Sequence, residues 1–345
     1  MIAIADPAGV GSRQGNRVTA LRYAAIFRSA GLTVCSATRL AHSARAGRSA
    51  ASARGEAGRE AMAADSTQRG DAVLVALHAR KSASTIVDWS VDRPNCPIVL
   101  VLTGTDLYEE FGRDRCVERS LDLASRIVVL QRDALRYLPE QYLSKSRVIV
   151  QSAQTPRRRL PRLSSVFEIC VSCHLRDVKD PLRAAMAARD LPAPSLIRIQ
   201  QLGGCLDAKW RRRLERELER NARLKYGGSL PHYRAQQLLA RSRLLVVSSR
   251  SEGAPNVASE AIAAGVPLLS TRISGMVGLL GEDYPGYFEV GDTAGLRDAM
   301  LRAERDRGWY AELRRHVRML RPLVAPSREK AEWARLLREL FHDLR

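Results

Sequence analysis

Two features are scarce in this 345-residue sequence: aromatic side chains and uninterrupted apolar segments. Aromatic residues make up 5%, so the basic segments lack the interleaved aromatic rings on which nucleic-acid bases stack. No segment reaches the roughly 18 to 20 consecutive apolar residues that cross a bilayer. The opening segment MIAIADPAG is too short for the apolar part of a signal peptide. We therefore predict a cytoplasmic protein without a membrane partner.

Acidic residues are also scarce relative to basic ones: 37 Asp and Glu against 56 Lys and Arg give a formal net charge of +19. Such an excess is typical of proteins that bind nucleic acids. The basic residues are spread along the chain, however, and in residues 211–220 (RRRLERELER) they alternate with glutamates as on a solvated helix face. We predict no nucleic-acid partner and keep a basic nucleic-acid-binding protein as a second alternative.

Metal-binding patterns are absent as well. Cys170 and Cys173 form the only closely spaced cysteine pair, and His174 follows them. A zinc site would need two more well-spaced ligands, and residues 166–173 (VFEICVSC) alternate as a strand does. No Asp-x-Asp motif follows a predicted strand. We therefore expect buried strand thiols, no metal and no cofactor.

Short apolar segments of strand length alternate with amphipathic segments of helix length along the whole chain. Predicted strands cover residues 2–5, 73–77, 98–102, 127–130, 147–150, 167–171, 196–200, 244–248 and 267–270, and predicted helices cover 19–30, 118–125, 207–221, 232–242 and 257–264. This alternation is typical of parallel sheets with helices on both faces. The predicted fold class is therefore α/β.

The chain exceeds the usual size of one hydrophobic core, so two domains are expected. Residues 151–165 combine prolines with an arginine run, which is typical of an interdomain linker. We predict an N-terminal domain at 1–158, with a surface insertion at 41–70, and a C-terminal domain at 159–326. Residues 327–345 begin with a serine cap and carry an amphipathic stripe. We expect this final helix to pack back on the N-terminal domain.

The strongest motif spans residues 244–271, LLVVSSRSEGAPNVASEAIAAGVPLLST. It predicts a strand, a turn, a helix and a second strand, with Glu252 in the loop and Glu260 inside the helix. Backbone amides of 253–257 lie at a helix N-terminus, which is a natural place for phosphate. The carboxylate of Glu260 could accept both hydroxyls of a ribose.

This segment resembles the C-terminal signature of family 4 glycosyltransferases. The resemblance implies a GT-B architecture, in which two Rossmann-like domains with parallel sheets face each other across a cleft. It implies that Glu252 is catalytic and lies near the donor sugar, and that Glu260 binds the nucleotide ribose. It also implies that residues of this loop bind the sugar hydroxyls and the diphosphate. These residues are Gly253, Asn256 and Val257.

Two upstream segments agree with this resemblance in order and spacing. Residues 171–181 (VSCHLRDVKDP) are similar to a motif in which an arginine and a lysine grip the diphosphate. Lys179 matches the lysine, whereas His174 stands at the arginine position and leaves Arg176 as the substitute. Alternatives are an ordinary loop lysine and a packing role for the histidine. In the segment 226–231 (YGGSLP), the resemblance implies that the backbone meets the base. The residues concerned are Gly228 and Ser229.

A narrower resemblance rests on several further motifs. They are QGNRVTA at 14–20, LHARKS at 77–82, LTGTDLY at 102–108, HLRD at 174–177 and GLLGEDYPGYF at 278–288. Together they resemble the selenosugar synthases of selenoneine biosynthesis. The resemblance implies metal-independent transfer of a sugar from a UDP-sugar, such as UDP-N-acetylglucosamine, to the selenium of selenophosphate, with release of UDP and phosphate. A conventional glycosyltransferase with a hydroxyl acceptor is the alternative.

The acceptor residues are expected in the N-terminal half. Gly15 and Asn16 follow the first strand, where their backbone can approach an anion. Polar and basic side chains follow two further predicted strands and suggest an anion pocket. We predict that Thr19, Arg80 and Thr105 contact the acceptor or its phosphate. We predict that His78 and Asp106 assist catalytically in the loss of phosphate. Capping roles for Thr19 and Asp106, a structural histidine, and an arginine paired with a nearby acid are the alternatives.

Overall fold

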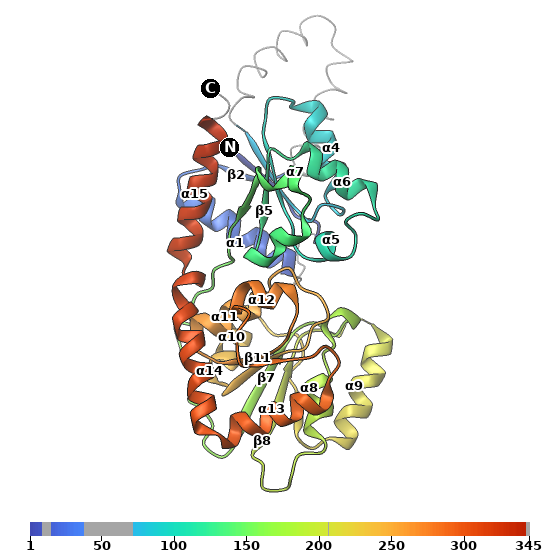
Figure 1. Cartoon of the computed structure of the whole chain (residues 1–345), viewed down its shortest axis with the longest axis vertical. Coiled ribbons are helices and arrows are strands. Elements are labelled where there is room, and N and C mark those ends of the chain that lie inside the picture. Colours follow the sequence, from blue (N-terminus) through green and yellow to red (C-terminus); the bar gives the residue numbers. More distant parts are fainter. Residues whose placement is uncertain (9–14, 38–71, 206, 343–345) are drawn as a thin grey trace, which may run out of the picture. The chain divides into compact units, whose positions relative to one another are not determined.

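The computed structural model describes residues 1–8, 15–37, 72–205 and 207–342. The predicted insertion at 41–70 thus lies outside the described residues. The chain divides into two compact units (Figure 1). Unit 1 consists of Met1–Ile149 together with Glu332–Arg345, and unit 2 consists of Val150–Ala331. The division after Ile149 precedes the predicted domain boundary after residue 158.

Unit 1 is built on a six-stranded parallel sheet with the order β2-β1-β3-β4-β5-β6. Its strands are β1 (Ile2–Ala5), β2 (Val34–Ser36), β3 (Val73–Leu77), β4 (Ile98–Val101), β5 (Arg126–Val129) and β6 (Ser146–Val148). The helices between them are α1 (Gly15–Ser29), α4 (Ala83–Asp92), α5 (Thr105–Tyr108), α6 (Arg115–Leu123) and α7 (Glu140–Leu143). The central strands are apolar throughout because both faces of the sheet are buried.

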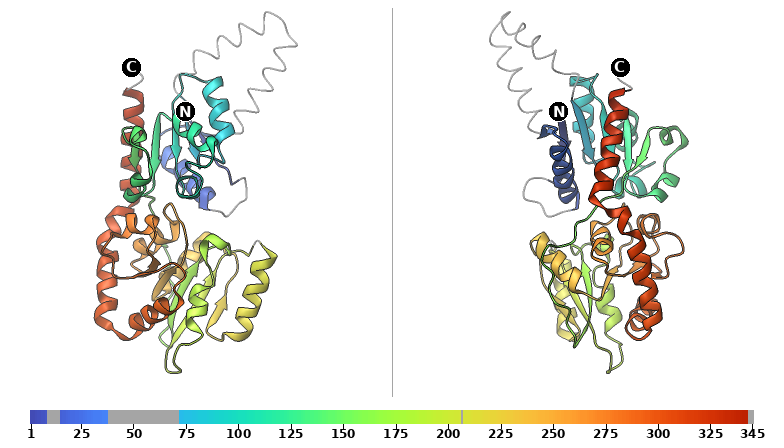
Figure 2. Two further views of the ribbon diagram at one scale, coloured as in Figure 1. Left: turned by 45° about the vertical axis from the view of Figure 1, so that its right-hand side comes forward. Right: turned by 90° about the vertical axis from the view of Figure 1, so that its left-hand side faces the viewer.

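The last helix, α15 (Pro326–His342; red in Figures 1 and 2), belongs to unit 1 from Glu332 onward. Its Trp333 is 1% exposed and packs edge-on against two aromatic rings of α1. The ring centroids lie 4.7 Å from Tyr23 and 5.1 Å from Phe27. Such pairs contribute about 0.5 to 1.5 kcal/mol beyond their buried area. Residues from the end of the chain thus complete the core of the unit that contains its beginning.

Unit 2 repeats the architecture, with a parallel sheet in the order β12-β11-β10-β7-β8-β9. Its strands are β7 (Phe167–Ser172), β8 (Ile197–Leu202), β9 (Leu224–Tyr226), β10 (Leu244–Val247), β11 (Leu268–Thr271) and β12 (Tyr287–Phe288). Its helices are α8 (Arg183–Ala188), α9 (Ala208–Arg220), α10 (His232–Arg241), α11 (Asn256–Ala264), α12 (Ser274–Leu280), α13 (Thr293–Arg305) and α14 (Arg307–Leu320). The predicted α/β fold class with two parallel sheets is confirmed.

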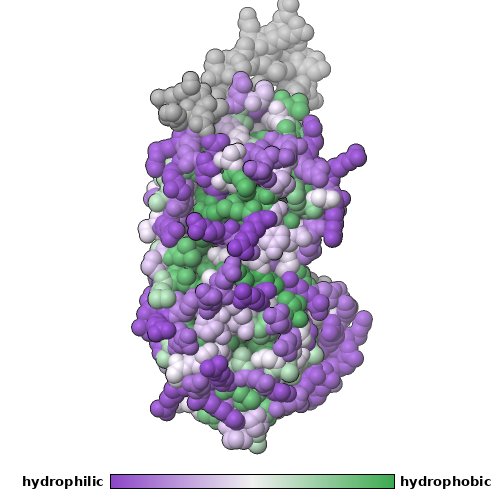
Figure 3. Space-filling view, in the orientation of Figure 1, coloured by the Kyte–Doolittle hydropathy of each residue, from purple (hydrophilic) through white to green (hydrophobic). Residues whose placement is uncertain are grey.

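The helix α9 carries the charged segment 211–220 on the surface, and Figure 3 shows hydrophilic residues over it. One of its glutamates is not solvated, however. Glu217 is 1% exposed and forms ion pairs with Arg189 and Arg220, and it accepts a hydrogen bond from Asn221 at 3.1 Å. The expectation of a fully solvated helix face was wrong at this position, because α9 turns Glu217 toward α8.

No helix within the described parts of the chain combines the length and the apolar character that a membrane crossing requires.

Candidate functional site

The candidate site in unit 2 lies at the carboxyl ends of β10, β7, β8 and β9, which are neighbours in the sheet. Ligands of parallel sheets bind at this edge, where strands give way to loops and helix N-termini. The loops after β7 and β10 are tied together here. The Arg250 amide donates to the Val178 carbonyl at 2.8 Å, and the Ser248 hydroxyl donates to the Asp180 carbonyl at 2.8 Å. These bonds hold the side chains of both loops in a fixed relation.

Lys179 and Glu252 form an ion pair between Nζ and Oε1. The same carboxylate oxygen accepts a hydrogen bond from the Ser249 hydroxyl at 2.7 Å. The side chains of the ion pair are 17% and 11% exposed, so the pair is largely shielded from water but open on one side. Two residues from separate sequence motifs thus lie side by side. The ammonium group of Lys179 can bind an anion there, and the carboxylate of Glu252 can accept a hydrogen bond from a hydroxyl group.

Gly275, in the first turn of α12, packs against the backbone of the loop that carries Glu252. A Cβ at this position would overlap the Glu252 carbonyl oxygen and would lie 3.0 Å from the Gly253 carbonyl oxygen. The first turn of α12 can therefore approach the loop that carries Glu252 only with glycine here. Gly275 was not among the site residues predicted from the sequence. The available signal was a glycine at the start of a helix that directly follows a buried strand.

The loop 253–257 leads into α11, which begins at Asn256. Gly253 is buried, and Asn256 and Val257 are half-buried at the helix start. The first amides of a helix have no partner inside it and carry the positive end of its dipole, so this loop favours an anion. Pro255 has no N–H, so the anion-binding amides come from the other residues.

Glu260 lies one turn into α11 and its side chain is 13% exposed. Its Oε1 lies 2.6 Å from the Nε2 of His232, the first residue of α10. His232 was not among the site residues predicted from the sequence. Its position directly after the predicted base-binding segment 226–231 was the signal that could have found it. A ligand hydroxyl at Glu260 would therefore share this carboxylate with an imidazole.

On the other side of the site, His174 accepts a hydrogen bond at Nδ1 from the Gly204 amide at 3.0 Å. A Cβ on Gly204 would lie 3.6 Å from Cβ of Ser229, so these loops are in contact. The Gly203 amide donates to the Gly228 carbonyl at 2.8 Å, and Gly228 adopts a positive φ of 66°. His174 thus fixes the backbone of a neighbouring loop.

Arg176 is exposed, and among the described residues its side chain has no ion-pair or hydrogen-bond partner. It is therefore available to an anionic ligand.

In unit 1, His78 follows β3 and is 2% exposed. Its Nε2 lies 3.0 Å from the Thr105 hydroxyl, and its Nδ1 accepts a hydrogen bond from the Lys81 amide at 3.4 Å. Burial lowers its pKa below the ordinary value of 6.5, against the opposing effect of the Asp106 carboxylate. The backbone φ is +70°, a conformation that few non-glycine residues adopt. A neutral imidazole is thus held in a strained loop.

Asp106 is fully buried, and its carboxylate accepts three backbone hydrogen bonds. The donors are the amides of Ala79 at 3.0 Å, Thr103 at 2.9 Å and Gly104 at 2.8 Å. The side chain therefore ties the loop after β3 to the loop after β4. This geometry is that of a residue that positions His78, and a direct part of Asp106 in catalysis stays a prediction.

Arg80 is held by two carboxylates. Its Nε lies 2.7 Å from Asp114, and its Nη1 lies 3.5 Å from Glu110. The guanidinium is nevertheless 57% exposed, and exposed ion pairs contribute little stability. An anion could therefore compete for it. Its predicted contact with the acceptor is not tested by this geometry.

Gly15 and Asn16 are the first two residues of α1, at the carboxyl end of β1. Thr19 lies one turn inside α1 and is 2% exposed. The helix therefore begins before Thr19, because Gly15–Val18 extend the predicted helix toward the N-terminus. Thr19 consequently faces the core rather than capping the helix.

The described cysteines are free thiols, with Cys170 buried in β7 and Cys173 just after that strand. Burial raises the pKa of Cys173 to about 11. Within the described ranges, no cluster of three or more His, Cys, Asp or Glu side chains is arranged to hold a metal ion.

Two parallel six-stranded sheets flanked by helices are the architecture of the GT-B class of fold. The family model described as "Glycosyl transferases group 1" matches residues 158–318. The matched range contains the ion pair of Lys179 and Glu252, the loop 253–257 and Glu260.

Two curated relatives match short stretches of the chain. A putative teichuronic acid biosynthesis glycosyltransferase of Bacillus subtilis is 30% identical over 86 residues, which cover 25% of this chain and 22% of that protein. The N-acetyl-alpha-D-glucosaminyl L-malate synthase of Bacillus anthracis is 38% identical over 71 residues, 20% of this chain and 19% of that protein. The match therefore spans about a fifth of the length of these relatives.

The fold also matches a solved structure. Anabaena HepE, crystallised in complex with UDP, aligns with a TM-score of 0.67 over 79% of this chain and 80% of its own. The two sequences are 15% identical in this alignment, so the comparison establishes the fold alone.

Proposed function

We propose that the protein is a glycosyltransferase that takes its sugar from a UDP-sugar. The observation that carries the proposal is the ion pair of Lys179 and Glu252 beside the N-terminus of α11. Residues 158–318, which contain these groups, match the family model. The UDP in the HepE crystal structure agrees with this choice of nucleotide.

In this proposal each group has a separate task. The amides of 253–257, with Lys179 and the exposed Arg176, bind the diphosphate and stabilise the negative charge that develops on it as the sugar leaves. Glu260 accepts the ribose hydroxyls. Glu252 accepts a hydrogen bond from a hydroxyl of the donor sugar, and it keeps Lys179 in position until the diphosphate binds. The charge on the leaving group is thus met by donors that are already in place.

For the acceptor we propose selenophosphate, on the resemblance of the motifs at 14–20, 77–82 and 102–108 to selenosugar synthases. Selenium attacks the anomeric carbon, the bond from that carbon to the diphosphate oxygen breaks, and its electron pair leaves with UDP. Water then attacks phosphorus, the selenium–phosphorus bond breaks, and phosphate is released while selenium stays on the sugar. Selenium is already nucleophilic, so positioning matters more than a strong base. His78, held neutral by burial, is the group that we assign to accept a proton from that water.

A hydroxyl acceptor is the second candidate. The observation in its favour is that Asp114 and Glu110 surround Arg80, which makes this part of unit 1 less cationic than the sequence suggested. The name of the Bacillus anthracis relative also refers to a hydroxy acid, L-malate.

The test is to incubate the protein with UDP-N-acetylglucosamine and either selenophosphate or L-malate, and to measure UDP and the products by mass spectrometry. We expect UDP release to depend on selenophosphate and to yield a product with the isotope pattern of selenium. If UDP release depends on L-malate instead, the acceptor is L-malate and not selenophosphate, and the proposed glycosyltransferase activity stands. If no UDP-sugar yields UDP with either acceptor, the proposed activity is wrong.

The variant Arg80→Ala separates the two parts of the proposal. We expect it to raise the KM for selenophosphate and to leave the affinity for UDP unchanged, because the nucleotide is assigned to unit 2. Equal effects on both substrates would assign Arg80 a structural role.

A further inference from the structure

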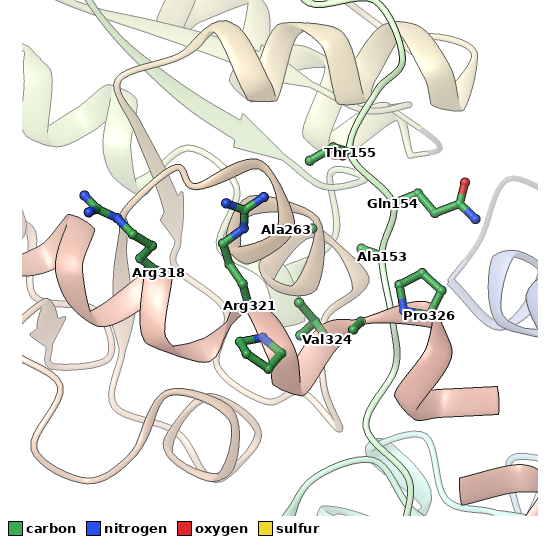
Figure 4. A pocket seen from close by; sticks show the side chains of 10 residues that line it. Ala153, Gln154, Thr155, Ala263, Arg318, Arg321, Val324 and Pro326 are labelled. Carbon is green, nitrogen blue, oxygen red and sulfur yellow. The ribbon is translucent and has the colours of Figure 1, made fainter. Parts of the chain in front are cut away.

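Unit 2 contains a cavity of about 740 Å³ away from the loops described above. Its wall is formed by two chain segments, 153–155 and 318–326, and by Ala263 of α11 (Figure 4). The volume lies within the range of roughly 300 to 1,000 Å³ that is usual for small-molecule sites. None of its lining residues belongs to the proposed donor site.

The cavity is positively charged. Arg318 and Arg321 line it, and no acidic residue is among the lining residues. In the part of the chain that the structure describes, neither guanidinium has an ion-pair or hydrogen-bond partner. The carboxyl end of α14 contributes a partial charge of only about −0.5, which two full positive charges exceed. An anion in the cavity would therefore meet a net positive field.

The remaining wall is mostly apolar. The side chains that form it are Ala153, Ala263, Pro322, Val324, Ala325 and Pro326. Figure 4 shows Arg321 extending toward Ala263, and Thr155 pointing into the same space, whereas Gln154 points away. A ligand could thus place an acidic group at Arg321 and Thr155 and an apolar body against the wall.

We propose that this cavity binds a small organic anion with an apolar body, such as a phosphate monoester or a carboxylate, as a second site separate from the donor site. The ligand touches three parts of unit 2 at once: the segment that enters it from Ile149, the segment that leaves it toward Glu332, and α11. The entering and leaving segments are already joined, because the Ala153 amide donates to the Val324 carbonyl at 3.1 Å.

The site has a route to the donor loop. Ala263 lies on the same helix as Glu260, and the N-terminus of that helix carries the loop 253–257. A ligand that packs against Ala263 is therefore in direct contact with α11. If the proposed function holds, the ligand would act as an effector of donor binding, and by linkage it stabilises whichever conformation binds it more tightly.

The test uses 1-anilinonaphthalene-8-sulfonate as the probe, because it combines an anionic group with apolar rings. Its fluorescence is titrated against the whole protein with saturating UDP present, so that the donor site is occupied. We expect the double variant Arg318→Ala/Arg321→Ala to weaken probe binding at least about 10-fold, the loss of a good charged contact. Arg307→Ala, at the exposed start of the same helix, should bind like the wild type.

Two further arms complete the test. Thr155→Trp should place an indole ring in the space beside Arg321 and weaken probe binding, and its circular dichroism spectrum should match that of the wild type. N-phenyl-1-naphthylamine, which has the same rings without the sulfonate, should bind equally to the wild type and the arginine variants. Unchanged probe affinity in the double variant, or an equal loss with Arg307→Ala, would overturn the proposal. Because the readout is binding, a failure of the proposed transferase activity leaves this result unaffected.

Discussion

Ser152 and Glu329 hold together the two points at which the chain passes between its units. The backbone amide of Ser152 donates to Oε2 of Glu329 at 2.9 Å, and its hydroxyl donates to the same oxygen. Glu329 is 1% exposed and lies in the first turn of α15. The chain enters unit 2 at Val150 and leaves it after Ala331. A buried carboxylate with two donors therefore fixes the entering and leaving segments to each other within unit 2.

We expect Glu329→Ala to lower the stability of unit 2 by about 1 to 3 kcal/mol, because the buried amide of Ser152 loses its acceptor. Urea unfolding followed by circular dichroism measures the change. The control is Arg328→Ala, since Arg328 is the exposed neighbour on the same helix and should change stability by less than about 0.5 kcal/mol. Equal losses in the two variants would show that the helix, and not this hydrogen-bonded pair, was disturbed.

Glu260→Ala should weaken UDP binding, because the ribose hydroxyls lose a charged acceptor. At about 1.5 to 3 kcal/mol for hydrogen bonds to a charged group, the Kd should rise roughly 10- to 150-fold. Isothermal titration calorimetry provides the measurement, and Glu219→Ala on the exposed face of α9 is the matched control. A folded Glu260→Ala variant with wild-type affinity for UDP would remove Glu260 from the proposed ribose site.

Gly275→Ala should disturb the site without touching a ligand. The added methyl group would overlap the Glu252 carbonyl and push the loop away from Lys179. We expect a stability loss of about 1 to 3 kcal/mol and a lower kcat. Gly308→Ala, in the first turn of α14, is the control, because alanine favours a helix over glycine there by up to about 1 kcal/mol. Wild-type kinetics in Gly275→Ala would mean that the loop adapts freely.

The stability of unit 1 should depend on pH through His78. Because burial lowers its pKa below 6.5, the unfolded chain takes up a proton below that pH while the folded protein does not. Stability is therefore unaffected by this group above about pH 6.5 and falls as the pH drops toward the lowered pKa, with a slope of at most about 1.4 kcal/mol per pH unit.

His78→Asn should reduce this slope, since asparagine tolerates a positive φ and does not titrate. Urea unfolding of both proteins between about pH 5 and pH 7.5 makes the comparison. Identical pH dependences would assign the acid sensitivity to other groups.

The parallel strands were predictable because a strand that is buried on both faces is apolar along its whole length, as β3 and β10 are. The strands β2, β9 and β12 were missed because they are two or three residues long and, unlike the equally short β6, are not followed by a run of apolar residues that lengthens the signal. The loop 253–257 was found because its helix start and glutamates lie close together in the sequence.

Other parts of the site depend on contacts between distant segments. The bond of His232 to Glu260 joins α10 to α11, and the close approach of Gly275 to Glu252 joins α12 to the loop that precedes α11. Local sequence patterns do not predict such contacts between distant segments. Likewise, the sequence left open whether Arg80 pairs with a nearby acid, and only the fold shows that Asp114 and Glu110 lie beside it.

The contact of Trp333 with Tyr23 and Phe27 has a consequence for biosynthesis. A ribosome delivers residues 1–149 long before Trp333, so the nascent first unit must wait with an incomplete core while the whole of the second unit is made. The second unit ends at Ala331, so its residues are complete before Trp333 is added. A stop codon or proteolytic cut that removes the last turns of α15 should therefore damage the beginning of the chain, and exposed Tyr23 and Phe27 would make the shortened product a target for chaperones.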